Sequence, residues 1–148
     1  MNELEIDLYL KNDLYTSGCY RGVMSFEELP HLETRRPSLY VINTDKRSGP
    51  GLHWTVLHLP SEKNDPPEFF DSLAETPSHY NASIENYLIR HGPQYNIIKD
   101  RIQGKYSSVC GNYCVLFAYF RCRGYSLEQF VSNFDRNDVD MNDVMVTF

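Results

Sequence analysis

A cysteine, a histidine, a glutamine and an aspartate stand in this sequence where a thiol-based reaction would need them. Cys110 begins an apolar segment with helical spacing that runs to Arg123, so it lies at the N-terminus of a predicted helix. The partial positive charge of a helix N-terminus favours a thiolate, and an imidazolium supplied by His53 would lower the pKa of the thiol further. The alternative for Cys110 is the usual role of a free cysteine, a small buried apolar side chain.

Gln103 and Asp71 would complete such a site. Gln103 can donate its side-chain amide to a tetrahedral oxyanion beside the backbone N–H of the cysteine, and its alternative is an ordinary exposed amide at a strand end. Asp71 can accept a hydrogen bond from the second ring nitrogen of His53 and hold the tautomer that takes the thiol proton. The alternative for Asp71 is a turn former at a strand end, and Glu68 and Asp65 are its nearest rivals.

Other residues near these motifs receive simpler roles. Three histidines are interpreted as surface or helix-end residues: His58, His79 and His91. Of these, His58 shares a predicted strand with His53 and should point to the opposite face. Trp54 should also face away from His53, so core packing and a role in walling a substrate cleft are both open. We assign Trp54 and Gly111 to substrate binding as an expectation.

The elements that must position these residues follow from hydrophobic periodicity, capping residues and turn residues. Helices are predicted at residues 3–16, 83–91, 110–123 and 126–134, and strands at residues 39–42, 52–59, 68–71 and 95–102. A mobile hairpin loop is predicted at 45–51, a single helical turn between Ser25 and Pro30, and no element is assigned to 135–148. His53 therefore opens one strand, Asp71 ends another, and Cys110 begins the central buried helix.

The size and charge of the chain limit the classes of protein to which it can belong. The 148 residues, 41% apolar and 14% aromatic, predict one compact domain spanning residues 1–148. The net charge of -6 disfavours broad, phosphate-driven binding of nucleic acid, which needs clustered Lys and Arg. The sequence has no apolar run of membrane-spanning length and no basic segment of a signal peptide near Met1, so we expect a soluble protein that is not exported by that route.

The four cysteines predict thiols and not bridges. Three of them lie on one predicted helix, which is a poor layout for a disulfide framework, so a reducing compartment is expected. Cys19, the fourth, is interpreted as a buried core thiol. The sequence has no CxxC or HxxxH spacing, so neither a metal site nor a cofactor is expected.

The order and local sequence of the motifs resemble the adenovirus-type cysteine proteases and, more broadly, the clan that also holds the SUMO- and ubiquitin-like-specific proteases. Residues 40–44, a Gly-rich loop and residues 52–54 look like the histidine strand of that family. Residues 69–72 look like its acidic strand, and residues 103–111 look like its glutamine and nucleophile motif. The resemblance covers roughly residues 4–130 and begins with the N-terminal helix.

This resemblance implies an α+β fold in which a mixed central β-sheet packs against a buried helix that carries the nucleophile. It implies His53 as base, Asp71 as the residue that orients it, Gln103 as oxyanion donor and Cys110 as nucleophile. It also implies cleavage after glycine in short sequences of small residues, typically during virion maturation.

Three departures from the family pattern bear on cofactors and partners. The acidic position holds Asp71, where many adenovirus enzymes have Glu. The chain ends soon after the helix that follows the nucleophile, and the segment just before Gln103 has no cysteine that could hold an activating peptide by a disulfide. These departures leave an activating peptide open, although without the disulfide link of the adenovirus enzymes, and they disfavour a DNA cofactor.

The sequence thus predicts a cysteine endopeptidase of a DNA virus or virus-like mobile element, acting on capsid or core precursors in the virion and in the infected-cell nucleus or cytoplasm. The alternatives are an isopeptidase specific for ubiquitin-like modifiers, an acetyltransferase of the same clan and a catalytically silent binding module. Papain-like proteases are excluded because their cysteine precedes their histidine, and caspases are disfavoured because their cysteine motif is absent.

Overall fold

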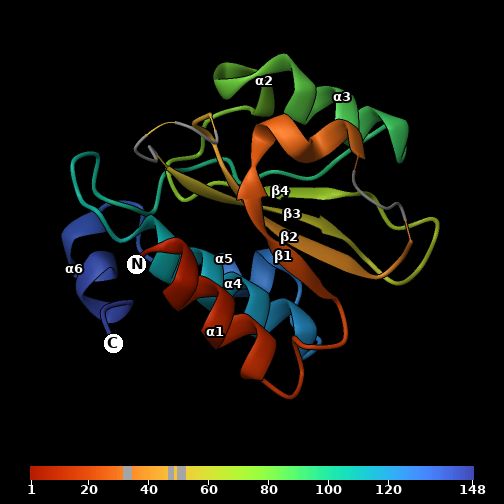
Figure 1. Ribbon diagram of the computed structural model, residues 1–148. Coiled ribbons are helices and arrows are strands. Elements are labelled where there is room, and N and C mark those ends of the chain that lie inside the picture. Colours follow the sequence, from red (N-terminus) through yellow and green to blue (C-terminus); the bar gives the residue numbers. More distant parts are fainter. Residues whose placement is uncertain (32–34, 47–48, 50–52) are drawn as a thin grey trace.

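Four strands form one mixed sheet at the centre of the molecule (Figure 1). The computed structural model describes residues 1–31, 35–46, 49 and 53–148. The strands are β1 (Tyr20–Ser25), β2 (Ser38–Asn43), β3 (Trp54–Leu59) and β4 (Glu68–Phe70), and they lie in the sheet in that order. β1 is parallel to β2, whereas β2 and β3 and then β3 and β4 are antiparallel. The predicted α+β fold with a mixed sheet is confirmed.

Helices cover both faces of the sheet. They are α1 (Glu3–Asn12), the 3-10 helix η1 (Phe26–His31), α2 (Pro77–Tyr80), α3 (Ala82–Arg90), α4 (Cys110–Cys122), α5 (Leu127–Val131) and α6 (Val139–Met145). In Figure 1, α1, α4 and α5 lie below the sheet, and α2 and α3 lie above it. The described helices include none with the length and apolar character needed to cross a membrane.

Side chains of the central strands alternate between two buried clusters, as the two-residue period of a strand requires. On β2, Leu39 and Val41 pack toward α1 and α4, while Tyr40 and Ile42 pack toward η1 and α3. Burial of an aliphatic side chain of this size contributes about 1.5–3 kcal/mol. α4 is buried over much of its length between the sheet, α1 and α5, in agreement with its strongly apolar sequence. The buried helix that the sequence predicted to begin at Cys110 is therefore the central helix of the fold.

The most periodic predicted elements are confirmed within a few residues. These are β2, β3, β4, α3, α4 and α5. The capping box at the start of α5 is also present: the Ser126 hydroxyl accepts from the Gln129 N–H at 3.0 Å, and the Gln129 side chain accepts from the Ser126 N–H at 2.8 Å. α5 ends at Val131, before the predicted boundary at Phe134.

Two predicted elements are wrong in extent or type. The helix predicted at 3–16 ends at Asn12, because Asp13 is extended and its side chain accepts from the N–H of Thr16 at 3.0 Å to form a separate turn. The strand predicted at 95–102 is an irregular segment that has a single bridge between Asn96 and Glu68. Ile98 and Ile102 of this segment are buried in the core, so the apolar pattern marks burial and not strand pairing.

Three elements were not predicted. β1 is an edge strand whose residues are mostly half-buried and which contains Gly22 at φ 142°, so it has no clear two-residue pattern. α2 is a single turn that begins at Pro77, and α6 lies in the segment to which no element was assigned. The hairpin loop predicted at 45–51 falls largely outside the described residues, although β2 and β3 pair as an antiparallel hairpin on either side of it.

Candidate active site

Strand pairing brings His53 and Asp71 together. His53 immediately precedes β3 and Asp71 immediately follows β4, and the two strands are antiparallel neighbours. The first residue of β3 and the last residue of β4 therefore lie at the same end of this strand pair. The Nε2 atom of His53 is 2.6 Å from Oδ1 of Asp71, and both side chains are buried. The predicted histidine–carboxylate pair is thus present in the structure.

The nucleophile candidate lies on the other side of the same imidazole. Cys110 is the first residue of α4, which packs against β3, and it lines the same cavity as His53, so close that each side chain shifts the pKa of the other. Since Nε2 is bound to Asp71, the ring offers Nδ1 to the sulfur. The backbone N–H groups of Trp54 and Gly111 also lower the pKa of the Cys110 thiol. His53 therefore joins a carboxylate to a thiol, which is the arrangement that activates a cysteine.

The electrostatics of this pair favour a thiolate and an imidazolium. Burial raises the pKa of the Cys110 thiol, but the hydrogen bond and positive charge of His53 and the two backbone N–H donors outweigh burial and lower that pKa below its ordinary value. Burial lowers the pKa of His53, but the hydrogen bonds and negative charges of Asp71 and Cys110 outweigh it and raise the pKa to about 9. The two groups stabilise each other in their charged forms.

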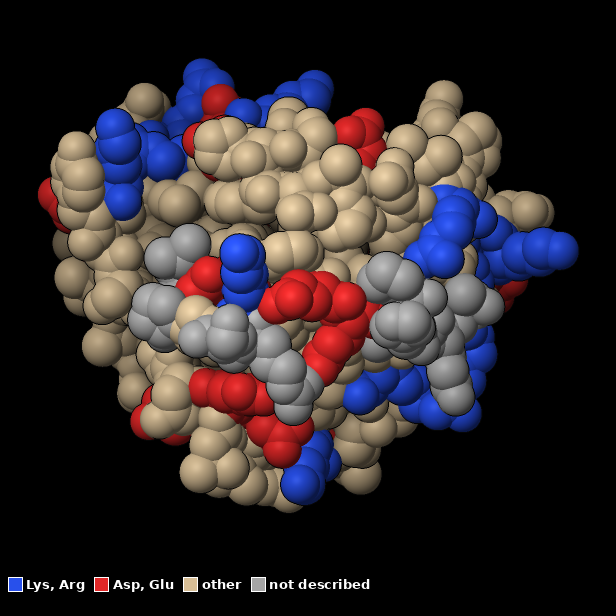
Figure 2. Space-filling model, turned by 45° about the horizontal axis from the view of Figure 1, so that its top comes forward, with Lys and Arg blue, Asp and Glu red and all other residues tan. Residues whose placement is uncertain are grey.

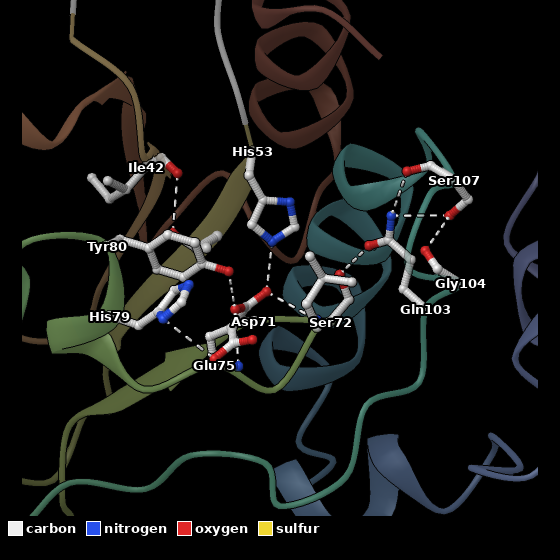
Figure 3. A network of polar contacts seen from close by, with 12 residues as sticks. Ile42, His53, Asp71, Ser72, Glu75, His79, Tyr80, Gln103, Gly104 and Ser107 are labelled. Atoms are coloured by element: carbon white, nitrogen blue, oxygen red, sulfur yellow. Dashed lines mark hydrogen bonds and ion pairs between the residues drawn. The ribbon is translucent and has the colours of Figure 1, made fainter.

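Asp71 is held in place by the segment that follows it. The N–H of Leu73 donates to Oδ1 at 2.9 Å, and the N–H of Glu75 donates to Oδ2 at 3.2 Å. The phenol of Tyr80, at the end of α2, also donates to Oδ2 (Figure 3). The Tyr80 ring lies beside the imidazole, with its centroid 5.7 Å from that of His53. Sequence reasoning missed Tyr80, because nothing in its local sequence indicates a contact with Asp71.

Gln103 is buried and its amide is fully engaged within the chain (Figure 3). Its Oε1 accepts from the Ser72 hydroxyl at 2.5 Å. Its Nε2 donates to the backbone carbonyl and to the hydroxyl of Ser107, each at 3.1 Å. Gln103 is therefore not the exposed amide of the alternative interpretation. To donate to an oxyanion, its Nε2 must exchange a contact with Ser107 for one with the substrate.

The candidate site opens onto one surface cavity of about 730 Å³. The cavity is lined by residues that include His53, Trp54, Tyr80, Gln103 and Cys110. Trp54 combines the two roles that the sequence left open, since its ring packs against the core cluster beside α4 and also lines this cavity. We call this cavity the catalytic cleft.

Gly111 does not line the catalytic cleft; it allows the N-terminal segment to approach α4. A Cβ atom at Gly111 would lie 3.0 Å from Cβ of Met1 and 3.2 Å from Cδ1 of Ile6. Met1 in turn borders the cleft, and its carbonyl accepts from the indole N–H of Trp54 at 3.3 Å. The absence of a side chain at Gly111 thus lets Met1 pack close to α4 at the border of the cleft.

The rival residues for the roles of His53 and Asp71 lie elsewhere. His58 is buried and its Nδ1 is 2.7 Å from Glu68, so its interpretation as a surface or helix-end histidine is wrong. Glu68 also binds Arg121 at 2.8 Å, and its carboxylate is engaged away from His53. Asp65 is exposed. The interpretations of the other two histidines hold: His79 is an exposed residue of α2, and His91 follows the last residue of α3.

The described residues contain no group of three His, Cys, Asp or Glu side chains that could hold a metal ion. Within that part of the chain, the polar groups around Cys110 are organised by hydrogen bonds among themselves.

No protein-family model and no curated protein sequence matches this chain. Among solved structures, 14 chains match it, and one of them is a crystal structure of the ASFV pS273R protease. The two chains share 17% sequence identity and superimpose with a TM-score of 0.60. The match covers 99% of this chain and 66% of the protease, so this chain spans about two thirds of that structure's length. The likeness shows that the two proteins share a fold.

Proposed function

We propose that this protein is a cysteine protease in which Cys110 is the nucleophile and His53 the general base and acid. The observation that carries the proposal is the position of His53 between Asp71 and Cys110 at the edge of the catalytic cleft. The structural likeness to a protease supports the same class of activity. A silent binding module would not need a buried imidazole that lowers the pKa of a thiol beside a cavity.

The reaction would follow from the charged pair. The Cys110 thiolate attacks the carbonyl carbon of the scissile peptide bond, and the His53 imidazolium gives its proton to the leaving amine as the C–N bond breaks. His53 then takes a proton from water, whose oxygen attacks the thioester and releases the acid product and the thiol. The backbone N–H of Cys110 and the amide of Gln103, once Nε2 has turned from Ser107, would stabilise the oxyanion.

For the natural substrate we propose capsid or core precursor proteins of a DNA virus or virus-like mobile element, cleaved after glycine in sites of small residues. The resemblance of residues 103–111 and 52–54 to the adenovirus-type motifs supports this choice. Virions and the infected-cell nucleus or cytoplasm would then be the sites of action. No membrane association and no disulfide-linked activating peptide is part of the proposal.

Nucleic acid is left out of the proposed partners because of charge. On the face of the molecule shown in Figure 2, acidic side chains gather near the middle, and most basic side chains lie toward the edges. Near the middle of this face, the described residues therefore form no continuous patch of Lys and Arg of the kind that binds phosphate backbones. The net charge of -6 agrees with that distribution.

The test uses fluorogenic peptides that end in Gly-Gly or Gly-Xaa-Gly, with purified wild type and Cys110→Ala and no added cofactor. Turnover by wild type alone would support a self-sufficient, glycine-directed cysteine protease. Equal turnover by Cys110→Ala would rule out the assigned nucleophile.

Two further enzyme classes are distinguished by additional reagents. Silence toward peptides together with labelling of Cys110 by a full-length modifier electrophile would favour an isopeptidase for ubiquitin-like modifiers. Binding of acetyl-CoA and acetylation of Cys110 would favour an acetyltransferase of the same clan.

A further inference from the structure

A second pair of thiols lies outside the catalytic cleft. The sulfur atoms of Cys19 and Cys122 are 2.8 Å apart. Cys19 immediately precedes β1, and Cys122 is the last residue of α4, so the contact joins segments that are distant in sequence. Sulfur atoms this close need little further approach to form a disulfide, whose S–S bond is about 2.05 Å long.

The backbone on both sides of the pair is held by other contacts. The N–H of Cys19 donates to the carbonyl of Thr16 at 3.1 Å, and its carbonyl accepts from the N–H of Leu39 at 2.9 Å. At the end of α4, Arg123 binds both carboxylate oxygens of Asp13, at 2.6 and 3.1 Å. The loop after α1 is thus attached to the end of α4 beside the two cysteines. This attachment holds the two sulfur atoms close together.

The pair also borders the surface and differs from the other thiols. Cys19 and Cys122 both line a surface cavity of about 590 Å³, and Cys122 is partly exposed. The hydrogen bond from Cys122 lowers the pKa of Cys19, against the opposing effect of burial, and the charge of Arg21 lowers it further. By contrast, burial raises the pKa of Cys114 well above its ordinary value, which makes that thiol unreactive.

We propose that Cys19 and Cys122 form a disulfide by exchange with a small-molecule disulfide such as oxidised glutathione. The thiolate of Cys19, which accepts the hydrogen bond of Cys122, attacks one glutathione sulfur, and one reduced glutathione leaves with a proton. Cys122 then gives up its proton and its sulfur attacks Cys19 in this mixed disulfide, and the second reduced glutathione leaves. The protein loses two protons and two electrons, and the glutathione disulfide gains them.

The bond would fasten the start of β1 to the far end of the nucleophile helix. Because the two residues are 103 positions apart, it would close a long loop and restrict the unfolded chain strongly. We expect the melting temperature to rise by roughly 10 °C. Cys110 lies at the opposite end of α4, so the cross-link leaves the catalytic thiol free.

The experiment incubates Cys110→Ala protein with oxidised glutathione, removes the reagent and maps the cysteines by mass spectrometry. The expected result is a loss of two hydrogen atoms, a linked peptide pair containing Cys19 and Cys122, and a higher melting temperature that a reductant reverses. The same treatment of Cys110→Ala/Cys122→Ser should give neither the linked peptides nor the rise in melting temperature.

Two results would overturn the proposal. One is a Cys110→Ala protein in which both thiols stay reduced or one of the two cysteines keeps a stable glutathione. The other is a linked pair that involves Cys114 in place of Cys19. Wild type treated in parallel tests whether the cross-link leaves Cys110 free. After oxidation, wild type should contain the same linked peptides. Cys110 should then react with iodoacetamide, once brief, mild reduction has removed any glutathione attached to it.

Discussion

Tyr80 donates a hydrogen bond to Oδ2 of Asp71 at 2.5 Å, which is the carboxylate oxygen that His53 does not use. The two oxygens of Asp71 thus serve two rings that lie side by side. With the N–H groups of Leu73 and Glu75 added, four donors fix the carboxylate. Tyr80 is therefore placed to position the imidazole through the carboxylate.

Replacing Tyr80 with Phe removes this hydrogen bond and keeps the ring beside His53. A hydrogen bond to a charged group contributes about 1.5–3 kcal/mol, so we expect kcat/KM toward a peptide substrate to fall about tenfold or more. Tyr95→Phe is a matched control, because the Tyr95 phenol makes only a 3.4 Å contact with Glu85, on α3. If both variants lose the same activity, or neither does, Tyr80 has no positioning role.

The pH dependence of activity should follow the charged pair. Because the pKa of Cys110 is lowered and that of His53 is raised to about 9, the thiolate and the imidazolium coexist at neutral pH. As pH rises through about 9, His53 loses the proton that the leaving amine needs, so kcat/KM should decline there. A pH profile of kcat/KM measures this limb, and a decline centred near pH 6.5 would contradict the raised pKa of His53.

Asp71→Asn tests the origin of that pKa. The hydrogen bond and negative charge of Asp71 raise the pKa of His53, so the amide variant should shift the alkaline limb to lower pH. A less stable imidazolium also leaves less thiolate, so Cys110 should react more slowly with iodoacetamide at pH 7. An alkaline limb and a labelling rate equal to those of wild type would show that Asp71 does not act on His53.

Gln103→Ala should lower kcat about 10² to 10³-fold if the amide donates to the oxyanion. Gln129→Ala is the matched control, since it removes an amide of the α5 capping box at the surface and should leave kcat unchanged. Stopped-flow or fluorogenic assays on both variants measure the difference. A kcat for Gln103→Ala within a few-fold of wild type would restrict Gln103 to its bonds with Ser72 and Ser107.

Ser107→Ala tests whether the Gln103 amide exchanges a hydrogen bond to Ser107 for one to the substrate. The variant removes one of the two acceptors of the Gln103 Nε2 and keeps the backbone carbonyl. The amide then turns toward a substrate more easily, so we expect kcat to stay equal to that of wild type or rise a few-fold. A large loss of kcat in Ser107→Ala would mean that the hydroxyl holds Gln103 in its working position.

The parts of the site that could be predicted are those with local signals. Cys110 begins the most apolar segment of the chain, and His53 and Asp71 lie at the ends of short, strongly β-prone segments that pair in space. Strand pairing of neighbours along the chain is common, so the sequence order of these motifs also predicts their proximity.

The parts that could not be predicted depend on tertiary contacts. Tyr80 reaches Asp71 only because a single helical turn folds back over the end of β4, and a four-residue helix has no periodic signal. Residues 95–102 alternate because Ile98 and Ile102 are buried in the core, which has the same signature as a strand. His58 is buried because Glu68 and Arg121 supply its partners from other elements.

The buried cluster of His58, Glu68 and Arg121 should matter for stability more than for chemistry. Arg121 lies at the end of α4, and its guanidinium binds both oxygens of Glu68, at 2.8 and 3.2 Å. Removing one partner of a buried ion pair leaves the other charge without compensation, which costs about 3–5 kcal/mol. We therefore expect Arg121→Ala to lower the free energy of unfolding by about that amount in urea titrations.

Arg136→Ala is the control for this change, because it also removes one guanidinium from an ion pair. Arg136 binds Asp100 at 3.2 Å, but the two side chains are 66% and 52% exposed, so its loss should alter the free energy of unfolding by no more than about 0.5 kcal/mol. Neither variant touches the catalytic cleft, and Cys110 in the folded protein should keep its reactivity toward iodoacetamide in both. Equal stability losses in the two variants would show that burial of the Glu68 cluster contributes nothing beyond a surface ion pair.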